Sequence, residues 1–415
     1  MTILFVALTS PYPPTNGHRL KTWSLLQALA RDRHSVTLLV LTVPGEEVED
    51  ASPLRKLCEH VDFISTRHDT GLLGHKYVQR LANVLSPLPY NATRFRCPHL
   101  KKRIHEAIAS AQFDVILCDG AYVMQNLPEQ TQTPVLLNKD DVAYLLAERY
   151  SKLEKNPIKK FYARVEARKL RRFEQDIVNR ATVLSCSELD RAQLQLLCPA
   201  ARIAVIPNVV DTNHYTPAGE GEKLSVLYQG GMDWYPNRDA VEFFISAILP
   251  RLRTLAPGLR FVVAGRDPRG NVGRRFAHLD DVRFTGAVPD MREQIARAAV
   301  CVVPLRIGSG TRLKILEAAA MAKPIVSTRV GAEGLNFIDG EEILLVDEPQ
   351  AFAKAIAELL ANQPYAQSLG QAARRRVEKN YGLPVLSAAL RHVLATSGPA
   401  RSTDHRQRER NEQVV

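Results

Sequence analysis

The chain has 415 residues, of which 45% are hydrophobic and 24% charged, and its formal net charge is +11. This length exceeds what one hydrophobic core usually supports, so we expect two domains of roughly 200 residues each. The positive charge indicates an acidic partner, which could be nucleic acid, anionic lipid or a phosphorylated small molecule.

Two further features bear on the compartment. Six cysteines are scattered along the chain without a C-x-x-C pair, and we interpret them as reduced thiols of a cytosolic protein. Met1 leads into the apolar stretch Ile3–Leu8 with no basic segment before it, and no run of about 18 apolar residues occurs. The sequence therefore predicts neither a signal peptide nor a membrane-spanning helix.

The chain begins with a βαβ pattern. Ile3–Leu8 predicts a strand, Thr9–Gly17 a proline-rich loop, His18–Ala30 a helix and Val36–Thr42 a second strand. The loop should then lie at the carboxyl ends of parallel strands, where open α/β sheets bind ligands. Cations follow Gly17 directly, in the first turn of the helix.

The alternation of strands and helices continues through the first half. Further strands are predicted at 115–118, 135–137, 181–185 and 203–206, with long helices over 142–180. Asp119 and the run 138–141 (NKDD) follow two of these strands, although strand-end carboxylates are more often loop caps than catalysts. Residues 216–223 (TPAGEGEK) have no periodic pattern and indicate a linker.

A second series of strands and helices follows the linker. Strands are predicted at 225–228, 261–264, 282–285, 300–304, 325–327 and 343–346, and helices from 238 and at 291–298, 312–321, 350–360, 365–380 and 386–394. Two such series predict two Rossmann-like parallel-sheet domains that face each other across a cleft. We expect an acceptor-side domain at 1–215, a donor domain at 222–385, a closing helix at 386–396 and a disordered tail at 397–415.

The stretch 304–326 carries the strongest local signal for function. A buried strand leads into Gly308-Ser309-Gly310, and a helix follows, so free N–H groups and the helix dipole favour an anion there. Arg312 and Lys314 stand in the first turn although the dipole disfavours cations, as a polyanion site would require. Alternatively, Lys314 pairs with Glu317 one turn on and both are solvated.

Three motifs resemble a known family. They are VPxxxGSGTRLKxLEAxAxxKPIV at 303–326, YQGGMDWYPNRDA at 228–240 and SPYPPTNG at 10–17. These motifs look like those of family-4 (group 1) glycosyltransferases of the GT-B fold, and more narrowly they are similar to bacterial sugar transferases associated with exopolysaccharide loci. The resemblance implies a retaining transfer of sugar from a nucleotide-diphosphate donor, held by the second domain, to a carbohydrate or lipid-linked acceptor at the first.

The resemblance also implies roles for residues. Glu317 would accept hydrogen bonds from the nucleotide ribose, and the backbone near Gly310 would face the donor. The full set with implied donor-binding roles is Asn16, Gly17, Gly230, Gly265, Arg266, Gly308, Ser309, Gly310, Thr311 and Glu317.

The chain departs from the family pattern at three positions. Ser309 stands where the first glutamate of the E-x7-E motif belongs, Gly230-Gly231 replaces a Gly-Arg pair, and Asp119 stands near a usual histidine. Arg312 and Lys314 are the candidate replacements for the missing diphosphate-binding charge. We take these two as catalytic candidates, with His18 and Asp119 as candidates that orient the acceptor; a structural role is open for each.

Several alternatives remain open for the function. An epimerase or phosphorylase of the same fold lacks a convincing lysine site for pyridoxal phosphate, whereas a non-catalytic nucleotide-sugar-binding protein would explain the loss of the first glutamate. Nucleic-acid binding is disfavoured because exposed-looking aromatics do not alternate with the basic residues. We expect no cofactor and no metal, because no Asp-x-Asp follows a strand in the second domain.

One segment concentrates the positive charge. Residues 152–172 contain nine Lys or Arg against two Glu, which is +7 of the total +11. Ile158, Phe161, Tyr162 and Val165 share one helical face there, so this segment could lie on an anionic membrane surface. In the alternative interpretation, the helix is solvated and its apolar face is part of the core. We therefore expect a cytoplasmic protein with possible peripheral membrane association at the inner face.

Overall fold

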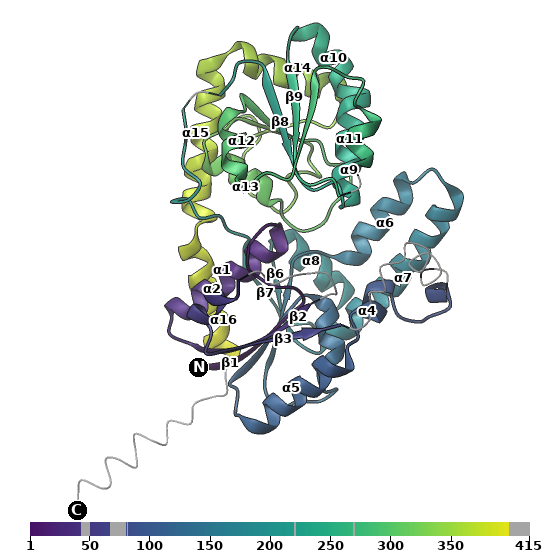
Figure 1. The fold of residues 1–415 in the computed structure, drawn as a ribbon, viewed down its shortest axis with the longest axis vertical. Helices are drawn as coiled ribbons and strands as arrows, with labels where there is room; N and C mark the ends of the chain where they lie inside the picture. The colour runs from purple at the N-terminus through teal and green to yellow at the C-terminus, as the bar shows by residue number, and fades with distance from the viewer. Residues whose placement is uncertain (43–49, 67–79, 81, 220, 269, 398–415) are drawn as a thin grey trace, which may run out of the picture.

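The computed structural model describes residues 1–42, 50–66, 80, 82–219, 221–268 and 270–397. The predicted tail at 397–415 lies outside these residues except for Ser397. The described chain forms two α/β domains, each built on a parallel sheet, and Figure 1 shows one domain above the other.

The first sheet has seven parallel strands in the order β3-β2-β1-β4-β5-β6-β7. Their bounds are β1 (Thr2–Ala7), β2 (Ser35–Thr42), β3 (His60–Ser65), β4 (Val115–Asp119), β5 (Val135–Lys139), β6 (Thr182–Ser185) and β7 (Ile203–Val205). β1 is buried from Ile3 to Ala7, as a central strand with helices on both faces must be. The order reverses between β1 and β4, whose register runs from Ile3↔Val115 to Ala7↔Asp119.

Helices cover both faces of this sheet. They are α1 (Gly17–Arg31), α2 (Ser52–Leu57), α4 (Tyr90–Arg94), α5 (Pro98–Ser110), the 3-10 helix η1 (Ala121–Asn126), α6 (Ala143–Leu153), α7 (Pro157–Asn179) and α8 (Glu188–Leu197). The start of α7 shows how the sequence sets a boundary. The Asn156 side chain accepts hydrogen bonds from the backbone N–H groups of Ile158 and Lys159, and Pro157 occupies the first helical position.

The second sheet has six parallel strands in the order β10-β9-β8-β11-β12-β13. Their bounds are β8 (Ser225–Gln229), β9 (Arg260–Ala264), β10 (Val282–Gly286), β11 (Val300–Val303), β12 (Ile325–Ser327) and β13 (Leu344–Leu345). Its helices are α9 (Tyr235–Phe243), the π-helix η2 (Phe244–Ile248), α10 (Leu249–Leu255), α11 (Asn271–Arg275), α12 (Met291–Arg297), α13 (Leu313–Ala320), α14 (Pro349–Ala361) and α15 (Gln363–Asn380). This order reverses between β8 and β11.

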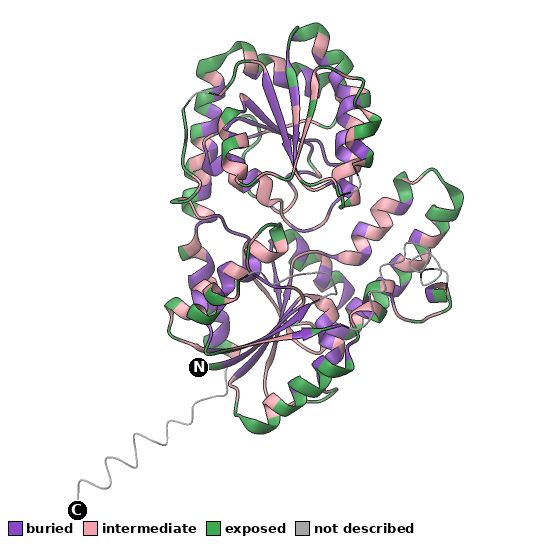
Figure 2. Ribbon diagram, in the orientation of Figure 1, coloured by how far each residue is buried: buried purple, intermediate pink, exposed green. Residues whose placement is uncertain are grey.

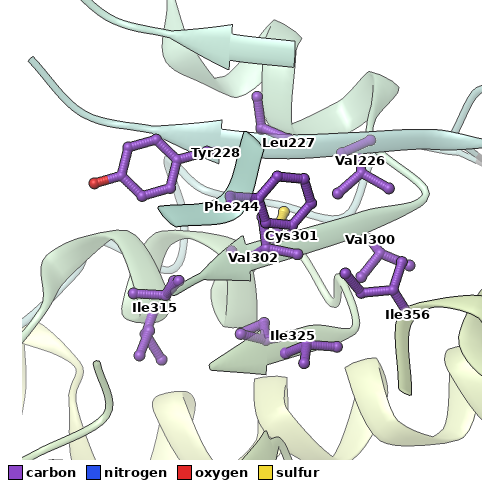
Figure 3. Close-up of a cluster of buried hydrophobic side chains, with 14 of the residues drawn as sticks. Val226, Leu227, Tyr228, Phe244, Val300, Cys301, Val302, Ile315, Ile325 and Ile356 are labelled. Carbon is purple, nitrogen blue, oxygen red and sulfur yellow. The ribbon is translucent and has the colours of Figure 1, made fainter. Parts of the chain in front are cut away.

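The core of the second domain lies between its sheet and the covering helices. Figure 3 shows Val226, Leu227 and Val302 of two neighbouring strands packed with Phe244 and other buried side chains. Figure 2 shows the same arrangement in both domains, with buried strands inside and exposed residues on the outer helix faces. The hydroxyl group of Tyr228 points away from this apolar cluster, toward the end of its strand (Figure 3).

The last described helix crosses back to the first domain. α16 (Leu383–Ser397) packs against α1, and its Leu386, Leu390 and Leu394 belong to the core of the first domain. Figure 1 shows this helix, in yellow, beside α1 and α2. The chain therefore connects its two domains twice, through the segment before β8 and through the step from α15 to α16.

The structure differs from the sequence-based elements at a few points. β3 was not predicted, because its residues mix polar and apolar types and lie half-exposed at the edge of the sheet. α9 begins at Tyr235 rather than Arg238, and Arg312 is the residue before α13 rather than within it. All six cysteines are free and buried. None of the described helices combines the length and hydropathy needed to cross a membrane.

Candidate active site

The predicted site residues gather where the strand order of each sheet reverses. In the first domain these are the loops after β1 and β4, and in the second domain the loops after β8 and β11, with Gly265 and Arg266 after the adjacent strand β9. Loops on the two sides of such a reversal leave the sheet in opposite directions and open a crevice at the carboxyl ends of the strands. The two crevices meet, because a Cβ atom added at Gly17 would lie only 3.2 Å from Cδ1 of Leu313.

His18 forms the centre of the first-domain side. It stands in the first turn of α1, whose start is capped by the Asn16 side chain accepting from the N–H of Arg19. Its Nδ1 lies 2.6 Å from Oδ2 of Asp140, and its Nε2 lies 3.2 Å from Oδ2 of Asp119. His18 is 27% exposed, so one side of this cluster faces the crevice.

The two carboxylates are fixed by neighbours on their own strands and on α1. Thr22 Oγ1 donates a 2.6 Å hydrogen bond to Asp119, and Asn138 Nδ2 donates a 2.7 Å bond to the other oxygen of the same carboxylate. Because β4 and β5 are adjacent and parallel, the ends of both strands meet at His18.

The charges of this cluster follow from its contacts. Burial lowers the pKa of His18, but the carboxylates of Asp119 and Asp140 outweigh it and raise that pKa to about 10. Burial raises the pKa of Asp119. For Asp140 burial also acts to raise the pKa, but the hydrogen bond and charge of His18, together with the charge of Lys21, outweigh it and lower that pKa. His18 is thus an imidazolium at neutral pH, held between carboxylates.

Lys314 forms the centre of the second-domain side. Its Nζ lies 3.0 Å from the hydroxyl oxygen of Tyr228, 3.0 Å from Oδ1 of Asn237 and 4.3 Å from the centre of the Tyr228 ring. A Cβ atom added at Gly230 would lie 3.0 Å from the same Nζ, so only glycine leaves this room. Burial and the charge of Arg312 lower the pKa of Lys314 to about 7.

Glu317 has partners other than Lys314. Its Oε2 accepts a 2.6 Å hydrogen bond from Gln229 Nε2, and its Oε1 accepts a 3.2 Å bond from the Tyr215 hydroxyl. Burial raises the pKa of this carboxyl. The ion pairs among the described residues do not include one between Lys314 and Glu317, which argues against the solvated surface pair.

The glycine loop before α13 is docked onto the first domain. Ser309 Oγ accepts from the N–H of Val142 at 2.7 Å, and the N–H of Gly310 donates to Oδ1 of Asp190 at 3.2 Å. Thr311 Oγ1 accepts a 2.7 Å hydrogen bond from Asn208 Nδ2. Gly310 has a φ of +74°, and a Cβ atom there would lie 2.1 Å from the carbonyl oxygen of Asp140, so this docking requires glycine.

Two arginines of the predicted set have partners within the protein. Arg312 Nη1 donates to the carbonyl oxygens of Ser309 and Gly310 at 2.6 Å each, which holds the glycine loop in shape. A third carbonyl, of Gly308, accepts a 2.6 Å bond from Arg149. Arg266 follows β9 and forms a 2.7 Å ion pair with Asp233 of the loop after β8. The preceding Gly265 lies against the same loop, since a Cβ atom there would be 2.3 Å from the carbonyl oxygen of Gly230.

Sequence reasoning missed several members of the site. Asp140 was visible in the run at 138–141 but was interpreted as a loop residue. Tyr228 and Asn237 lay inside a recognised motif, yet nothing local indicated that they contact Lys314, 86 and 77 residues away. Gln229 and Tyr215, the partners of Glu317, were not singled out.

The arrangement is suited to a bound polyanion. α1 and α13 both present N-termini to the crevice, and neither has an acidic residue in its first turn that would compensate the helix dipole. Lys314 adds a cation with two of its three protons engaged. Across the part of the chain that the structure describes, no three His, Cys, Asp or Glu side chains converge as metal ligands.

Comparisons with known families agree across both domains. A family model described as "Glycosyltransferase Family 4" matches residues 16–214, and a model described as "Glycosyl transferases group 1" matches residues 223–362. An uncharacterised 44.6 kDa protein in the cps region of Klebsiella pneumoniae is 23% identical over 397 residues, which cover 91% of this chain and 96% of that protein.

A second relative matches about half of the chain. The GDP-mannose-dependent alpha-(1-6)-phosphatidylinositol monomannoside mannosyltransferase of Mycobacterium tuberculosis is 28% identical over 226 residues, which cover 49% of this chain and 58% of that protein.

Solved structures share the arrangement of both domains. Sucrose-phosphate synthase from Thermosynechococcus elongatus superimposes with a TM-score of 0.72 at 19% identity, covering 95% of this chain and 98% of that one. HepE of Anabaena in complex with UDP and glucose superimposes with a TM-score of 0.66 at 15% identity, covering 95% and 99%. The predicted two-domain fold is confirmed, and the chain belongs to the family-4 (group 1) glycosyltransferases of the GT-B fold.

Proposed function

We propose that this protein is a retaining hexosyltransferase that moves a sugar from a nucleoside-diphosphate sugar to a carbohydrate or lipid-linked acceptor in the synthesis of exopolysaccharide or another cell-surface glycan. The observation that carries the proposal is the position of Lys314 at the start of α13, beside Gly230, with one ammonium proton left for a ligand. Negative charge builds on the leaving diphosphate as its bond to the sugar C1 breaks, so this cation would stabilise the transition state.

The remaining donor contacts follow from the positions of neighbouring residues. Glu317 lies on the same face of α13 as Lys314, three residues further on, and would accept hydrogen bonds from the ribose hydroxyls. The N-terminus of α1 at Gly17 would approach the diphosphate from the other domain. Ser309 and Thr311, at present bound to first-domain groups, would lie near the donor sugar.

The relatives support the classes of donor and acceptor. HepE of Anabaena was solved with UDP-glucose as well as with UDP and glucose, and the Mycobacterium tuberculosis relative is named as a mannosyltransferase that uses GDP-mannose and phosphatidylinositol monomannoside. The Klebsiella pneumoniae relative belongs to a cps region. These names motivate a nucleotide-sugar donor, a lipid-linked acceptor and a role in surface polysaccharide synthesis for this chain.

We assign the orientation of the acceptor to the cluster of His18, Asp119 and Asp140. Because both nitrogens of the His18 imidazolium face carboxylates, His18 would act by holding Asp140 in place. An oxygen of Asp140, whose side chain is 26% exposed, would then accept a hydrogen bond from the acceptor hydroxyl group. The exposed side of this cluster would then meet the acceptor as it approaches the donor.

The proposed reaction would need no metal ion and would take place at the membrane. Lys314 and the N–H groups at the starts of α1 and α13 supply positive charge for the diphosphate, so catalysis would need neither a divalent metal nor another cofactor. The enzyme would act in the cytoplasm, with peripheral association at the inner face of the membrane through residues 152–172.

Donor hydrolysis without acceptor tests this function. A panel of UDP- and GDP-sugars is incubated with the protein, and the release of nucleoside diphosphate is measured with and without EDTA. We expect slow release from at least one donor, unchanged by EDTA, and retention of the anomeric configuration in any transfer product by NMR. Tight binding of a donor without any release would instead favour the non-catalytic nucleotide-sugar-binding protein. Loss of release in EDTA that magnesium or manganese restores would contradict the metal-free site.

A further inference from the structure

The hairpin of α6 and α7 carries apolar side chains that the fold leaves uncovered. Figure 1 shows the two helices projecting to the side, with their turn away from both sheets. Near this turn Ile158 is 77% exposed, Phe161 is 63% exposed and Leu153 is 42% exposed. Among the residues that the structure describes, none of the hydrophobic core clusters includes any of these three or has them packed against it.

The core-facing side of α7 is made by other residues. Ala163, Ala167 and Leu170 are buried, and Leu170 and Phe173 belong to the core of the first domain. Tyr162 and Val165, which sequence spacing grouped with Ile158 and Phe161, are half-buried. The structure therefore divides the expected apolar face, and its exposed part lies outside the core clusters of the described residues.

The exposed apolar tip is surrounded by positive charge. The exposed basic residues of the segment are Lys152, Lys155, Lys159, Arg164, Arg168, Arg171 and Arg172. The two exceptions are Lys160, which is half-buried, and Lys169, which is buried and donates to the carbonyl oxygen of Asn83. The nearby Glu154 accepts hydrogen bonds from the Tyr150 hydroxyl and the N–H of Asn156, and the charge of Lys159 helps to lower its pKa, so this single carboxylate offsets only part of the positive charge of the tip.

This surface fits an anionic lipid bilayer. Apolar side chains flanked by lysine and arginine bind at the boundary of headgroups and acyl chains, where anionic lipids attract the cations. We infer that the tip of the α6–α7 hairpin is a membrane anchor, with Ile158 and Phe161 inserted between anionic headgroups and Lys155, Lys159 and Arg164 bound to their phosphates.

The position of the hairpin connects this anchor to the active site. α6 starts at Ala143, two residues after Asp141, and its 11 residues give a length of about 16 Å. α6 is fixed to the second domain, because Arg149, just past the middle of this helix, donates to the carbonyl oxygen of Gly308 and forms an ion pair with Glu333. A bilayer at the tip therefore lies within reach of the crevice, which suits a lipid-linked acceptor. This link between the anchor and the acceptor rests on the proposed function.

Vesicle sedimentation tests the anchor. Wild-type protein is mixed with vesicles of phosphatidylcholine alone or with about one third phosphatidylglycerol, and the bound fraction is measured. One variant combines Ile158→Ser with Phe161→Ser, and a second combines Lys155→Glu, Lys159→Glu and Arg164→Glu. We expect binding of the wild type to the anionic vesicles alone, and a loss of at least about tenfold in affinity for each variant.

Matched control variants separate binding through the tip from a general effect of net charge or of exposed apolar side chains. Lys354→Glu, Arg375→Glu and Lys379→Glu change the net charge equally on exposed positions of α14 and α15, and Leu196→Ser removes an exposed apolar side chain from α8. Both controls should bind anionic vesicles like the wild type. Wild-type binding by both tip variants, equal binding of the wild type to neutral vesicles, or no binding at all would overturn the inference.

A separate measurement keeps this test independent of the proposed function. Donor hydrolysis in solution without vesicles should be the same in the tip variants and the wild type, and melting temperatures confirm that the variants fold. Normal hydrolysis together with unchanged vesicle binding would reject the anchor and leave the transferase intact. Vesicle binding without hydrolysis of any donor would retain the anchor and count against the transferase.

Discussion

Replacing Lys314 by alanine removes a cation whose contacts allow the effect to be estimated. Two of its three ammonium protons donate to Tyr228 and Asn237, so one proton remains for an oxygen of the leaving diphosphate. A hydrogen bond to a charged group is worth about 1.5–3 kcal/mol. Because about 1.4 kcal/mol corresponds to a factor of ten in rate, we expect kcat to fall about 10- to 150-fold. The donor KM should change less, since the charge on the diphosphate builds in the transition state.

The pH dependence provides an independent readout of the same residue. Burial and Arg312 lower the pKa of Lys314 to about 7, so the free enzyme loses this cation as the pH rises above about 7. The wild-type kcat/KM should therefore fall on the alkaline side, and this decrease should be absent in Lys314→Ala.

The assay follows nucleoside diphosphate release with increasing donor from pH 6 to 9. Lys354→Ala, at an exposed position of α14, serves as the control, and melting temperatures verify folding. Wild-type turnover in Lys314→Ala, or the same alkaline decrease in both proteins, would refute the reasoning.

Three further predictions follow from the contacts of the site. Glu317→Gln should mainly raise the donor KM, because a ribose contact would be equally strong before and during reaction; a lower kcat at unchanged KM in steady-state kinetics would contradict this. The pKa of His18 is raised to about 10, so its charged form stabilises the fold fully below pH 6.5 and progressively less up to about pH 10. The free energy of unfolding in urea should therefore fall less between pH 7 and 9.5 in His18→Gln than in the wild type. An equal loss in both proteins would count against the charged cluster. In Gly310→Ala the new Cβ would clash with the carbonyl oxygen of Asp140, so small-angle scattering should show a larger radius of gyration and activity should fall at least several-fold; unchanged values would mean that the docked loop is not required.

The fold could be predicted from the sequence largely because parallel strands are short, apolar and separated by helices. β1 and β11 are buried almost throughout, so each gives a clear apolar run. β3 gives no such run, because an edge strand is half-exposed and keeps polar residues. The exit of α16 to the first domain could not be predicted either, since an amphipathic pattern does not specify which core a helix joins.

The candidate site was predictable only where its residues are close in sequence. The glycine loop, Lys314 and Glu317 lie within ten residues, and the helix start explains why an anion binds there. The contacts of His18 with Asp140 and of Lys314 with Tyr228 join residues 122 and 86 positions apart, and they depend on strand order rather than on local pattern. The docking of Gly310 on Asp190 likewise depends on the relative position of the two domains.

Helical spacing predicted that residues 152–172 have an apolar and a basic character but not which side is exposed. Phe161 lies three residues after Ile158 and Val165 four residues after Phe161, so the three share one helical face. Only the packing of α7 shows that the end of this face near the hairpin turn, with Ile158 and Phe161, is exposed. The same limit applies to Arg312, whose guanidinium turns back to the carbonyl oxygens of its own loop.

The central claim, that a nucleoside-diphosphate sugar binds at the start of α13, is tested most directly by thermal unfolding with a panel of nucleotide-sugars. A donor at a hundred times its Kd should stabilise the wild type by about 2.7 kcal/mol. We predict such a stabilisation with at least one UDP- or GDP-sugar, a clearly smaller one in Lys314→Ala combined with Glu317→Gln, and an unchanged one in Lys354→Ala. A panel in which no nucleotide-sugar stabilises the wild type, or in which the double variant is stabilised equally, would contradict the claim.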